Sequence, residues 1–371
     1  MYILGIETSC DDTAAAVIEV HGGFAKPSRG FGEPKFSVLA NTSYSQVAIH
    51  KKFGGIVPNL ASRAHLEKII PTIKETFKIA KKKTENIDLI AVTKGPGLLP
   101  SLLIGVNTAR ALAYRFRKPI IGVNHIEGHI YSNWLTNKKI ESPALILVVS
   151  GGHTELVLMS ARGGSALGGK NSIKYKIIGQ TLDDAAGECF DKTARLLELG
   201  FPGGPAIAAA ANKLPITNYK LQVQLPRPMI NSKDYNFSFS GLKTAVLYLY
   251  NDLIKKYPAK EISPAIAAEV QNAIIDVLTA KTVKAIENLN PKTVMIAGGV
   301  SANKALREKM VKEIESYGIP FLMPDISYAT DNAAMIAVAG YFSAKGGSAS
   351  GGNYLDKDSW KKIEADANLK L

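Results

Sequence analysis

The chain has 371 residues, of which 46% are hydrophobic and 21% charged, a composition typical of globular proteins. Its net charge of +13 favours an anionic partner such as a nucleic acid, a nucleotide or a membrane surface, although a basic background composition is an alternative. Two isolated cysteines, Cys10 and Cys189, argue against a disulfide framework or a zinc ribbon and predict a reducing compartment. We find no targeting segment and no apolar run approaching about 18 residues, so we expect a cytoplasmic protein that does not span a membrane.

A strand–turn–strand pattern occurs twice in the chain. Residues 2–20 contain an apolar strand, the polar turn "TSCDDT" and a second apolar strand. Residues 144–160 repeat this design around the turn "GGHT". Self-similarity over such a distance indicates a duplicated domain, because solenoid repeats have periods of about 20–50 residues.

Alternating helix and strand patterns connect the two copies. The helix expected at residues 62–80 places five apolar residues at helical spacing. These are Leu66, Ile69, Ile70, Ile73 and Phe77. This helix is followed by a buried strand at 87–93, the turn sequence "KGPG", a helix at 101–116 and a strand at 118–123.

The second half continues as α/β sequence. We expect a helix at 183–200 that Gly200 and Pro202 end. A long helix at 263–289 has Ser263 as its N-cap and Pro264 at its first position. Residues 293–310 read as a strand, two glycines and a helix. The segment "GGSASGG" at 346–352 is flexible by composition and precedes a polar, lysine-rich tail that we do not expect in the core.

Three glycine-containing turns are candidate nucleotide contacts. In "GIETSCDDT" and "VSGGHT", backbone N–H groups at a tight turn can hold phosphate, and hydroxyl groups add donors. Any hairpin needs turn residues, so either turn alone is equally a structural feature. The stretch "AGGVSANKALR" ends a strand and opens a helix, where a nucleotide can lie against a helix N-terminus. It is neither a Rossmann fingerprint nor a P-loop.

Together these features resemble the actin, sugar-kinase and Hsp70 (ASKHA) superfamily. A series of motifs narrows the resemblance to the TsaD-type tRNA N6-adenosine threonylcarbamoyltransferases of bacteria, whose relatives include the KEOPS catalytic subunit. In order, they are "GIETSCDDT", "GGIVPNLASRAH", "GPGLLPSLLIGV", "NHIEGHI", "VSGGHTEL", "DDAAGECFDKTARLL", "FPGGP", "NFSFSGLKT", "AGGVSANKALR" and "TDNAAMIA". The resemblance implies two RNase H-like halves with a cleft between them. We expect the halves at 1–132 and 133–345, with a linker and tail at 346–371.

The resemblance also implies an acyl transfer. Members of this family move a threonylcarbamoyl group from L-threonylcarbamoyl-AMP to N6 of the adenosine 3′ of the tRNA anticodon and release AMP. The attacking amine is a poor nucleophile, so the site must hold the adenylate and the tRNA and stabilise developing negative charge. A metal ion acting as Lewis acid and template suits the last need, and donors at the glycine turns add to it.

His125 and His129 stand four residues apart in "NHIEGHI", so on a helix they share one face and can chelate an ion. From the residues alone, a polar helix pair is the alternative. The zinc-protease pattern is excluded because Glu127 points away from the shared face. The resemblance makes both histidines metal ligands and adds Asp331 of "TDNAAM", which locally reads as a helix N-cap. Two histidines and one carboxylate suit Fe(II), and Zn(II) also accepts them.

The resemblance assigns further residues to the substrate. Residues 148–152 match the substrate-binding loop. This loop consists of Val148, Val149, Ser150, Gly151 and Gly152. Asp191 and Gly204 match contacts to the adenylate, and Asn303 matches a contact to its adenosine. Asp191 also belongs to an acidic helical stripe that can simply face solvent. We expect Asp11 in the first turn to act in catalysis, whereas the role of Asp12, where many relatives have glutamate, is less defined.

The expected partners are tRNA, a TsaB-like paralogue, a TsaE-like ATPase and a TsaC-type enzyme that supplies the adenylate. Lysine clusters at 51–52, 81–83 and 138–139 can contact tRNA phosphates or simply be solvated. Two alternatives remain: a small-molecule kinase or ATPase on the same fold, and an inert scaffold in a tRNA-modifying assembly. The histidine pair disfavours a kinase, since kinases hold Mg²⁺ chiefly through carboxylates and phosphates.

Overall fold

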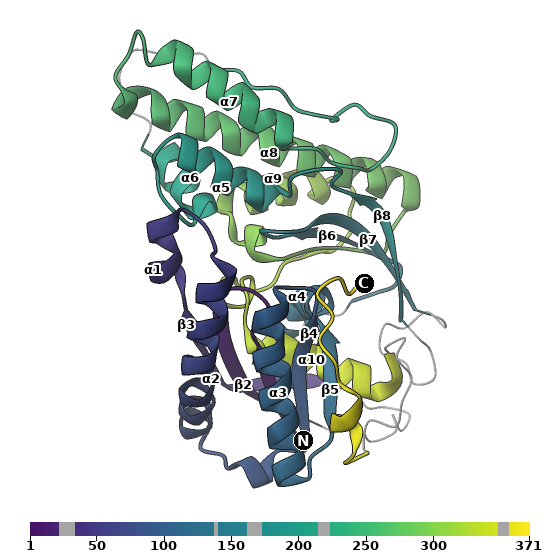
Figure 1. Ribbon diagram of the computed structural model, residues 1–371. Coiled ribbons are helices and arrows are strands. Elements are labelled where there is room, and N and C mark those ends of the chain that lie inside the picture. The colour runs from purple at the N-terminus through teal and green to yellow at the C-terminus, as the bar shows by residue number, and fades with distance from the viewer. Residues whose placement is uncertain (22–33, 137–139, 162–172, 214–222, 348–355) are drawn as a thin grey trace.

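Two five-stranded sheets of identical topology form the framework of the computed structural model (Figure 1). The structure describes residues 1–21, 34–136, 140–161, 173–213, 223–347 and 356–371. The strands are β1 (Tyr2–Glu7), β2 (Asp12–His21), β3 (Lys35–Ser45), β4 (Leu89–Gly95), β5 (Ile120–Asn124), β6 (Ala144–Val149), β7 (Thr154–Ala161), β8 (Ile173–Gln180), β9 (Thr293–Ala297) and β10 (Phe321–Leu322). The first sheet has the order β3-β2-β1-β4-β5 and the second the order β8-β7-β6-β9-β10. In both sheets the first three strands in the chain are antiparallel and the last two pair in parallel, which confirms the predicted duplication.

Helices cover both sheets and fill the space between them. They are α1 (Val47–His50), α2 (Pro58–Ala80), α3 (Leu99–Phe116), α4 (His125–Tyr131), α5 (Ala186–Leu196), α6 (Gly203–Ala211), α7 (Ser240–Leu253), α8 (Ala259–Leu289), α9 (Lys304–Glu315) and α10 (Ala333–Phe342). Helices α2 and α3 pack on the outer face of the first sheet, and α5 to α9 lie on the outer side of the second (Figure 1). Helices α4 and α10 lie between the inner faces of the two sheets.

Helix α10 has an unusual place, because it follows the second sheet in the chain but packs against the first. All ten of its residues are buried, and it contacts β1, β2 and β4 as well as α4. A helix that is apolar all round is expected in such a central layer. The predicted domain boundaries stay a prediction, and α10 connects the two halves physically.

Several local predictions differ from the structure. Helix α8 begins at Ala259, so Ser263 and Pro264 lie inside it, because Ile262 is fully buried and keeps the preceding turn helical. On α2, Ile69 and Ile73 are buried, but Leu66 is 68% exposed, so the predicted apolar stripe is only partly a core face.

The prediction that the C-terminal tail stays out of the core is wrong for the described part of the tail. Trp360, Ile363 and Ala365 pack against the apolar cluster under α2 and α3, and Leu371 packs against the cluster between the sheets. The predicted linker lies mostly outside the described residues. Lys138 and Lys139 also lie outside them, whereas Lys51, Lys52, Lys81 and Lys83 are exposed.

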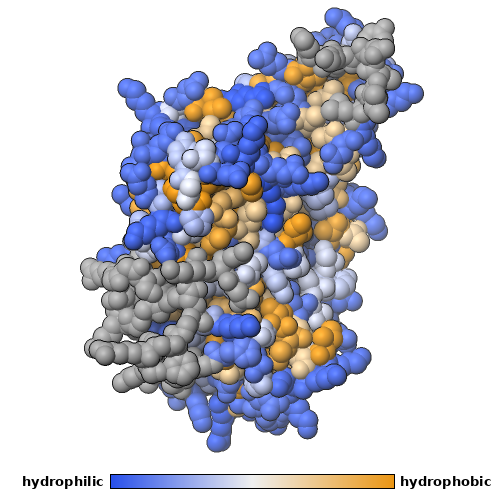
Figure 2. Space-filling model, turned by 180° about the vertical axis from the view of Figure 1, so that it is seen from behind, coloured by the Kyte–Doolittle hydropathy of each residue, from blue (hydrophilic) through white to orange (hydrophobic). Residues whose placement is uncertain are grey.

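The surface has the mixed polar and apolar character expected from the overall composition. Figure 2 shows a face on which hydrophilic residues predominate and hydrophobic residues gather in smaller groups. Within the described ranges, we find no helix with the length and apolarity needed to cross a membrane.

Candidate metal centre

Helix α4 carries both histidines of the candidate site. It follows β5 directly, and the side-chain oxygen of Asn124 caps it by accepting hydrogen bonds from the backbone N–H groups of Ile126 (2.8 Å) and Glu127 (3.4 Å). Side chains four residues apart on a helix lie on one face. Accordingly, the rings of His125 and His129 lie edge to face with centroids 4.6 Å apart, and both are buried.

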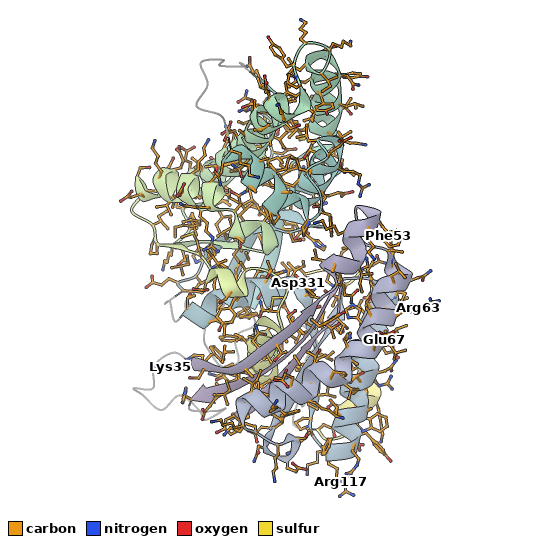
Figure 3. All side chains as sticks on the ribbon, turned by 90° about the vertical axis from the view of Figure 1, so that its left-hand side faces the viewer. Lys35, Phe53, Arg63, Glu67, Arg117 and Asp331 are labelled. Carbon is orange, nitrogen blue, oxygen red and sulfur yellow. The ribbon has the colours of Figure 1, made fainter. Side chains whose placement is uncertain are left out.

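Asp331 meets these histidines from a segment about 200 residues later. It stands just before α10, where the two halves meet (Figure 3). Its Oδ1 lies 3.1 Å from Nε2 of His129 and 3.5 Å from Nε2 of His125. The predicted N-cap role of Asp331 is wrong, because Asn332 caps α10 by accepting a hydrogen bond from the N–H of Met335. The carboxylate of Asp331 is therefore directed toward the histidines.

Glu7, at the end of β1, orients His125. Its Oε2 lies 2.9 Å from Nδ1 of His125 and accepts a hydrogen bond of 2.6 Å from the hydroxyl of Thr93. Its other oxygen accepts a hydrogen bond from the N–H of Ser9. A carboxylate on Nδ1 keeps a proton there, so Nε2, on the side of Asp331, is the nitrogen that can give its lone pair to a metal ion.

The charges of this cluster shift several pKa values. Burial alone would lower the pKa of His125, but the carboxylates of Glu7 and Asp331 raise it to about 9. Burial would raise the pKa of Asp331, yet His125 and His129 hold it well below its usual range. Burial, followed by the neighbouring His125 and His129, lowers the pKa of His153 to about 4. His153 is therefore a neutral imidazole at pH 7. Its ring lies near enough to His125 and His129 for their charges to act on it.

The residues present fit a divalent metal ion. One donor atom from each of His125, His129 and Asp331 lies within 4.8 Å of the others. His129 is fully buried, and neither of its ring nitrogens makes a hydrogen bond of normal geometry within the described part of the chain. Nε2 of His129 thus faces the Asp331 carboxylate without a well-aligned hydrogen bond, and shared ligation of a metal ion by these two groups accounts for this arrangement.

The second glycine turn exposes backbone rather than side chains. Val148 and Val149 end β6, and both side chains are fully buried in the core. Ser150 closes the turn, because its N–H donates to the carbonyl of His153 and its hydroxyl accepts from the N–H of His153. Gly151 and Gly152 are exposed, and a Cβ on either would meet no atom within 4 Å. Of the five predicted loop residues, the last three can offer groups to a ligand.

The predicted adenylate residues lie on α5, on α6 and at the N-cap of α9. Asp191 accepts a 2.6 Å hydrogen bond from the N–H of Gly203, and the neighbouring Gly204 faces open space. Asn303 caps α9 through its oxygen and donates to Gln271 through its nitrogen (2.9 Å). The structure thus gives Asp191 and Asn303 local structural bonds, and one N–H of Asn303 remains for a ligand.

The first turn adds carboxylates beside the histidine cluster. Burial and the nearby Asp331 raise the pKa of Asp11, and burial with the same neighbour raises that of Asp12 to about 7. The charge of Asp11 also raises the pKa of Asp191 after the larger effect of burial, so carboxylates from the two halves interact. Arg195 of α5 donates a hydrogen bond to the carbonyl of Gly54, which also joins the halves.

Comparison with known proteins decides the family. The sequence profile of the family described as "TsaD: tRNA N6-adenosine threonylcarbamoyltransferase" matches residues 37–338. The chain belongs to this family. A protein of that name from Thermosipho africanus is 44% identical over 371 residues and covers all of both chains. The Bacillus subtilis protein of that name is 46% identical over 342 residues, which is 92% of this chain and 90% of the relative.

Solved structures support the ASKHA-type fold. Component A of (R)-2-hydroxyglutaryl-CoA dehydratase from Acidaminococcus fermentans has a TM-score of 0.51 and 14% identity, covering 93% of this chain and 99% of its own. Full-length HypF has a TM-score of 0.51 and 11% identity, covering 93% of this chain and 55% of its own. At these identities the likeness concerns the fold, and the threonylcarbamoyltransferase family assignment comes from sequence.

Sequence reasoning missed three residues of this candidate site. Glu7 interrupts an apolar strand at its last position, and a carboxylate in such a place is a usable signal of a buried polar partner. Asn124 immediately precedes the helix, and asparagine is one of the residue types favoured at an N-cap. Thr93 lies within the apolar run of β4, and no local pattern distinguishes its role.

Proposed function

We propose that the protein transfers a threonylcarbamoyl group from L-threonylcarbamoyl-AMP to N6 of the adenosine 3′ of the anticodon, in tRNAs that read codons starting with adenine. The observation that carries this proposal is the convergence of His125, His129 and Asp331 in a chain of the threonylcarbamoyltransferase family. The N6 amine forms a bond to the carbamoyl carbon and loses a proton. The bond from that carbon to the phosphate oxygen breaks, and AMP leaves.

Three side chains form the metal centre in this proposal. His125 and His129 each provide Nε2, and Asp331 provides a carboxylate oxygen. A bound divalent ion, with Fe(II) favoured over Zn(II), supplies Lewis-acid stabilisation of the charge that develops on the carbamoyl and phosphate oxygens. Glu7 keeps the proton of His125 on Nδ1 and fixes the ring, as a hydrogen-bonded carboxylate does for many histidine ligands.

The glycine turns hold the adenylate. The turn offers the N–H groups of Gly151 and Gly152 and the hydroxyl of Ser150 to the phosphate. Asp191 accepts hydrogen bonds from ribose hydroxyls beside the open backbone at Gly204, and Asn303 contacts the adenosine with its remaining N–H. Asp11, at the edge of the first turn, accepts the proton released from N6. The position of Asp11 supports this role, because the residue is half-buried beside the histidine cluster and across from Asp191.

A TsaB-like paralogue completes the working assembly, together with a TsaE-like ATPase, while a TsaC-type enzyme supplies the adenylate. The outer face of α2 and α3 supports a protein partner, because it exposes large apolar side chains in helical register. These are Leu66, Ile70, Leu99 and Leu103, with exposures of 68%, 45%, 45% and 43%. Arg63 and Glu67 point outward from the same helix α2 (Figure 3). The cytoplasm, where tRNA is found and the free thiols of Cys10 and Cys189 stay reduced, is the expected compartment.

Reconstitution tests this function. The protein is incubated with L-threonylcarbamoyl-AMP and unmodified tRNA, with and without the two partner proteins, and the digested nucleosides are analysed by mass. We expect N6-threonylcarbamoyladenosine in the complete mixture. A parallel reaction supplies labelled ATP and small hydroxyl acceptors without tRNA. Rapid phosphoryl transfer there, with no modified adenosine, would establish the kinase alternative instead. A scaffold role is established if the complete mixture is equally active with the His129→Ala variant.

A further inference from the structure

The last described segment of the chain is anchored on the N-terminal half. The carbonyl of Trp360 accepts a hydrogen bond of 2.9 Å from Nε of Arg110, and its ring packs edge-on against Tyr114 at 5.1 Å. The hydroxyl of Ser359 accepts a 3.0 Å bond from the N–H of Ile120, at the start of β5. Figure 1 shows the segment rising along β5 from this anchor to a C-terminus near α4.

Beyond the anchor, the segment binds the loop that supports the first turn of the site. The N–H of Asp366 donates to the carbonyl of Lys94 (2.7 Å), and the N–H of Gly97 donates to the carbonyl of Ala367 (3.3 Å). The same loop contacts the first turn directly. Gly97 packs so closely on Ser9 that a Cβ would lie 2.5 Å from the Ser9 carbonyl oxygen.

The end of the segment also reaches the residue that caps the histidine helix. The side-chain nitrogen of Asn124 donates a 3.1 Å hydrogen bond to the carbonyl of Lys370. The oxygen of the same side chain caps α4, and His125 is the next residue. A helix of seven residues has little stability of its own. Its direction therefore depends on this cap and on packing.

We propose that residues 364–371 form a positioning strap for the metal centre. The strap fixes the Asn124 side chain and the 94–97 loop, and through them the directions of His125 and the first turn. Metal–ligand distances tolerate changes of only about 0.2 Å, so a small rotation of α4 weakens binding. This inference rests on the proposed metal centre, whose ligands it does not include.

Two variants test the strap while keeping the anchor. A chain ending at Ile363 keeps Ser359 and Trp360 but lacks the strap. In the full chain, Asn124→Ser keeps a hydroxyl that can cap α4 but is too short to reach the Lys370 carbonyl. Lys370→Ala is the matched control, because the bond uses the main-chain carbonyl. Affinity for Zn²⁺ is measured by chelator competition, and hydrogen exchange is followed at the amides of 125–131.

We expect both variants to bind Zn²⁺ about tenfold more weakly and to exchange α4 amides faster, whereas Lys370→Ala matches wild type. Wild-type affinity in both strap variants would overturn the strap and leave the metal centre standing. Failure of the wild type itself to bind any divalent ion would overturn the metal centre and the strap together. If the shortened chain does not fold, the result for Asn124→Ser decides alone.

Discussion

Gly5 in the centre of the first sheet controls how closely α10, and therefore Asp331, approaches the histidines. A Cβ at Gly5 would lie 2.1 Å from the carbonyl oxygen of Ala333, the first residue of α10. Side-chain Cβ atoms essentially never come within 3.0 Å of another heavy atom, so Gly5→Ala must displace this end of α10 by roughly 1 Å. No rotamer change relieves a clash with backbone, and overpacking of this kind costs about 1–3 kcal/mol.

The same displacement acts on the metal centre, because Asp331 stands two residues before Ala333. A shift of roughly 1 Å is several times the tolerance of a metal–ligand bond. We therefore expect Gly5→Ala to unfold at lower urea concentration and to bind Zn²⁺ at least about tenfold more weakly. Urea titration followed by circular dichroism measures the first effect, and chelator competition measures the second.

Two other glycines provide the controls. Gly340→Ala also crowds the α10 interface, where its Cβ would lie 2.5 Å from the Cβ of Ala91, but at the opposite end of α10 from Asp331. It should lower stability with a smaller loss of metal affinity. Gly241→Ala, in open space on α7, should be neutral or slightly stabilising. Wild-type stability and metal affinity in Gly5→Ala would refute the reasoning about α10.

Three further predictions concern single side chains. Glu7→Gln keeps the size of the side chain but places an amide NH₂ among the donors of His125, Thr93 and Ser9. Metal affinity measured by chelator competition should therefore fall about tenfold. Unchanged affinity would exclude the orienting role of Glu7. Asp183→Ala removes the acceptor for the N–H groups of Phe239 and Ser240 at the start of α7 and should cost about 1 kcal/mol in urea unfolding. Burial raises the pKa of Asp183, but hydrogen bonds from the hydroxyls of Ser238 and Ser240, and then from these N–H groups, hold it below its usual range. The cost is therefore present at neutral pH and disappears as the pH falls through this lowered value; a cost independent of pH would contradict the assignment. Burial raises the pKa of Cys189 to about 12, so native protein at pH 8 should resist iodoacetamide at this thiol, and labelling as fast as in denatured protein would contradict its burial.

The sequence predicts the duplicated hairpins well, because alternating apolar strands around short polar turns specify their own pairing. In both hairpins the observed register joins the strands across the predicted turn, with Glu7 opposite Ala14 and Val149 opposite Thr154. The histidine pair is equally visible, since a helix converts a spacing of four into a shared face.

Long-range contacts limit the same reasoning. Asp331 and Asn332 are both good N-cap residues, and only the tertiary position of α10 decides which one caps and which one faces the histidines. The C-terminal segment reads as a polar tail because its main contacts are made by backbone groups, whose partners no side-chain pattern encodes. In the same way, Pro264 normally marks the start of a helix, but the buried Ile262 belongs to a helical turn before it, so α8 begins earlier in the chain.

The most direct test of the account compares the single-turnover formation of N6-threonylcarbamoyladenosine by wild type and by Asp331→Ala. Asp252→Ala, an exposed carboxylate on α7, serves as the control. We predict that loss of the Asp331 carboxylate lowers the rate by at least about 100-fold while the control retains the wild-type rate. An Asp331→Ala protein that modifies tRNA as fast as wild type would contradict the claim that transfer takes place at the centre formed by His125, His129 and Asp331.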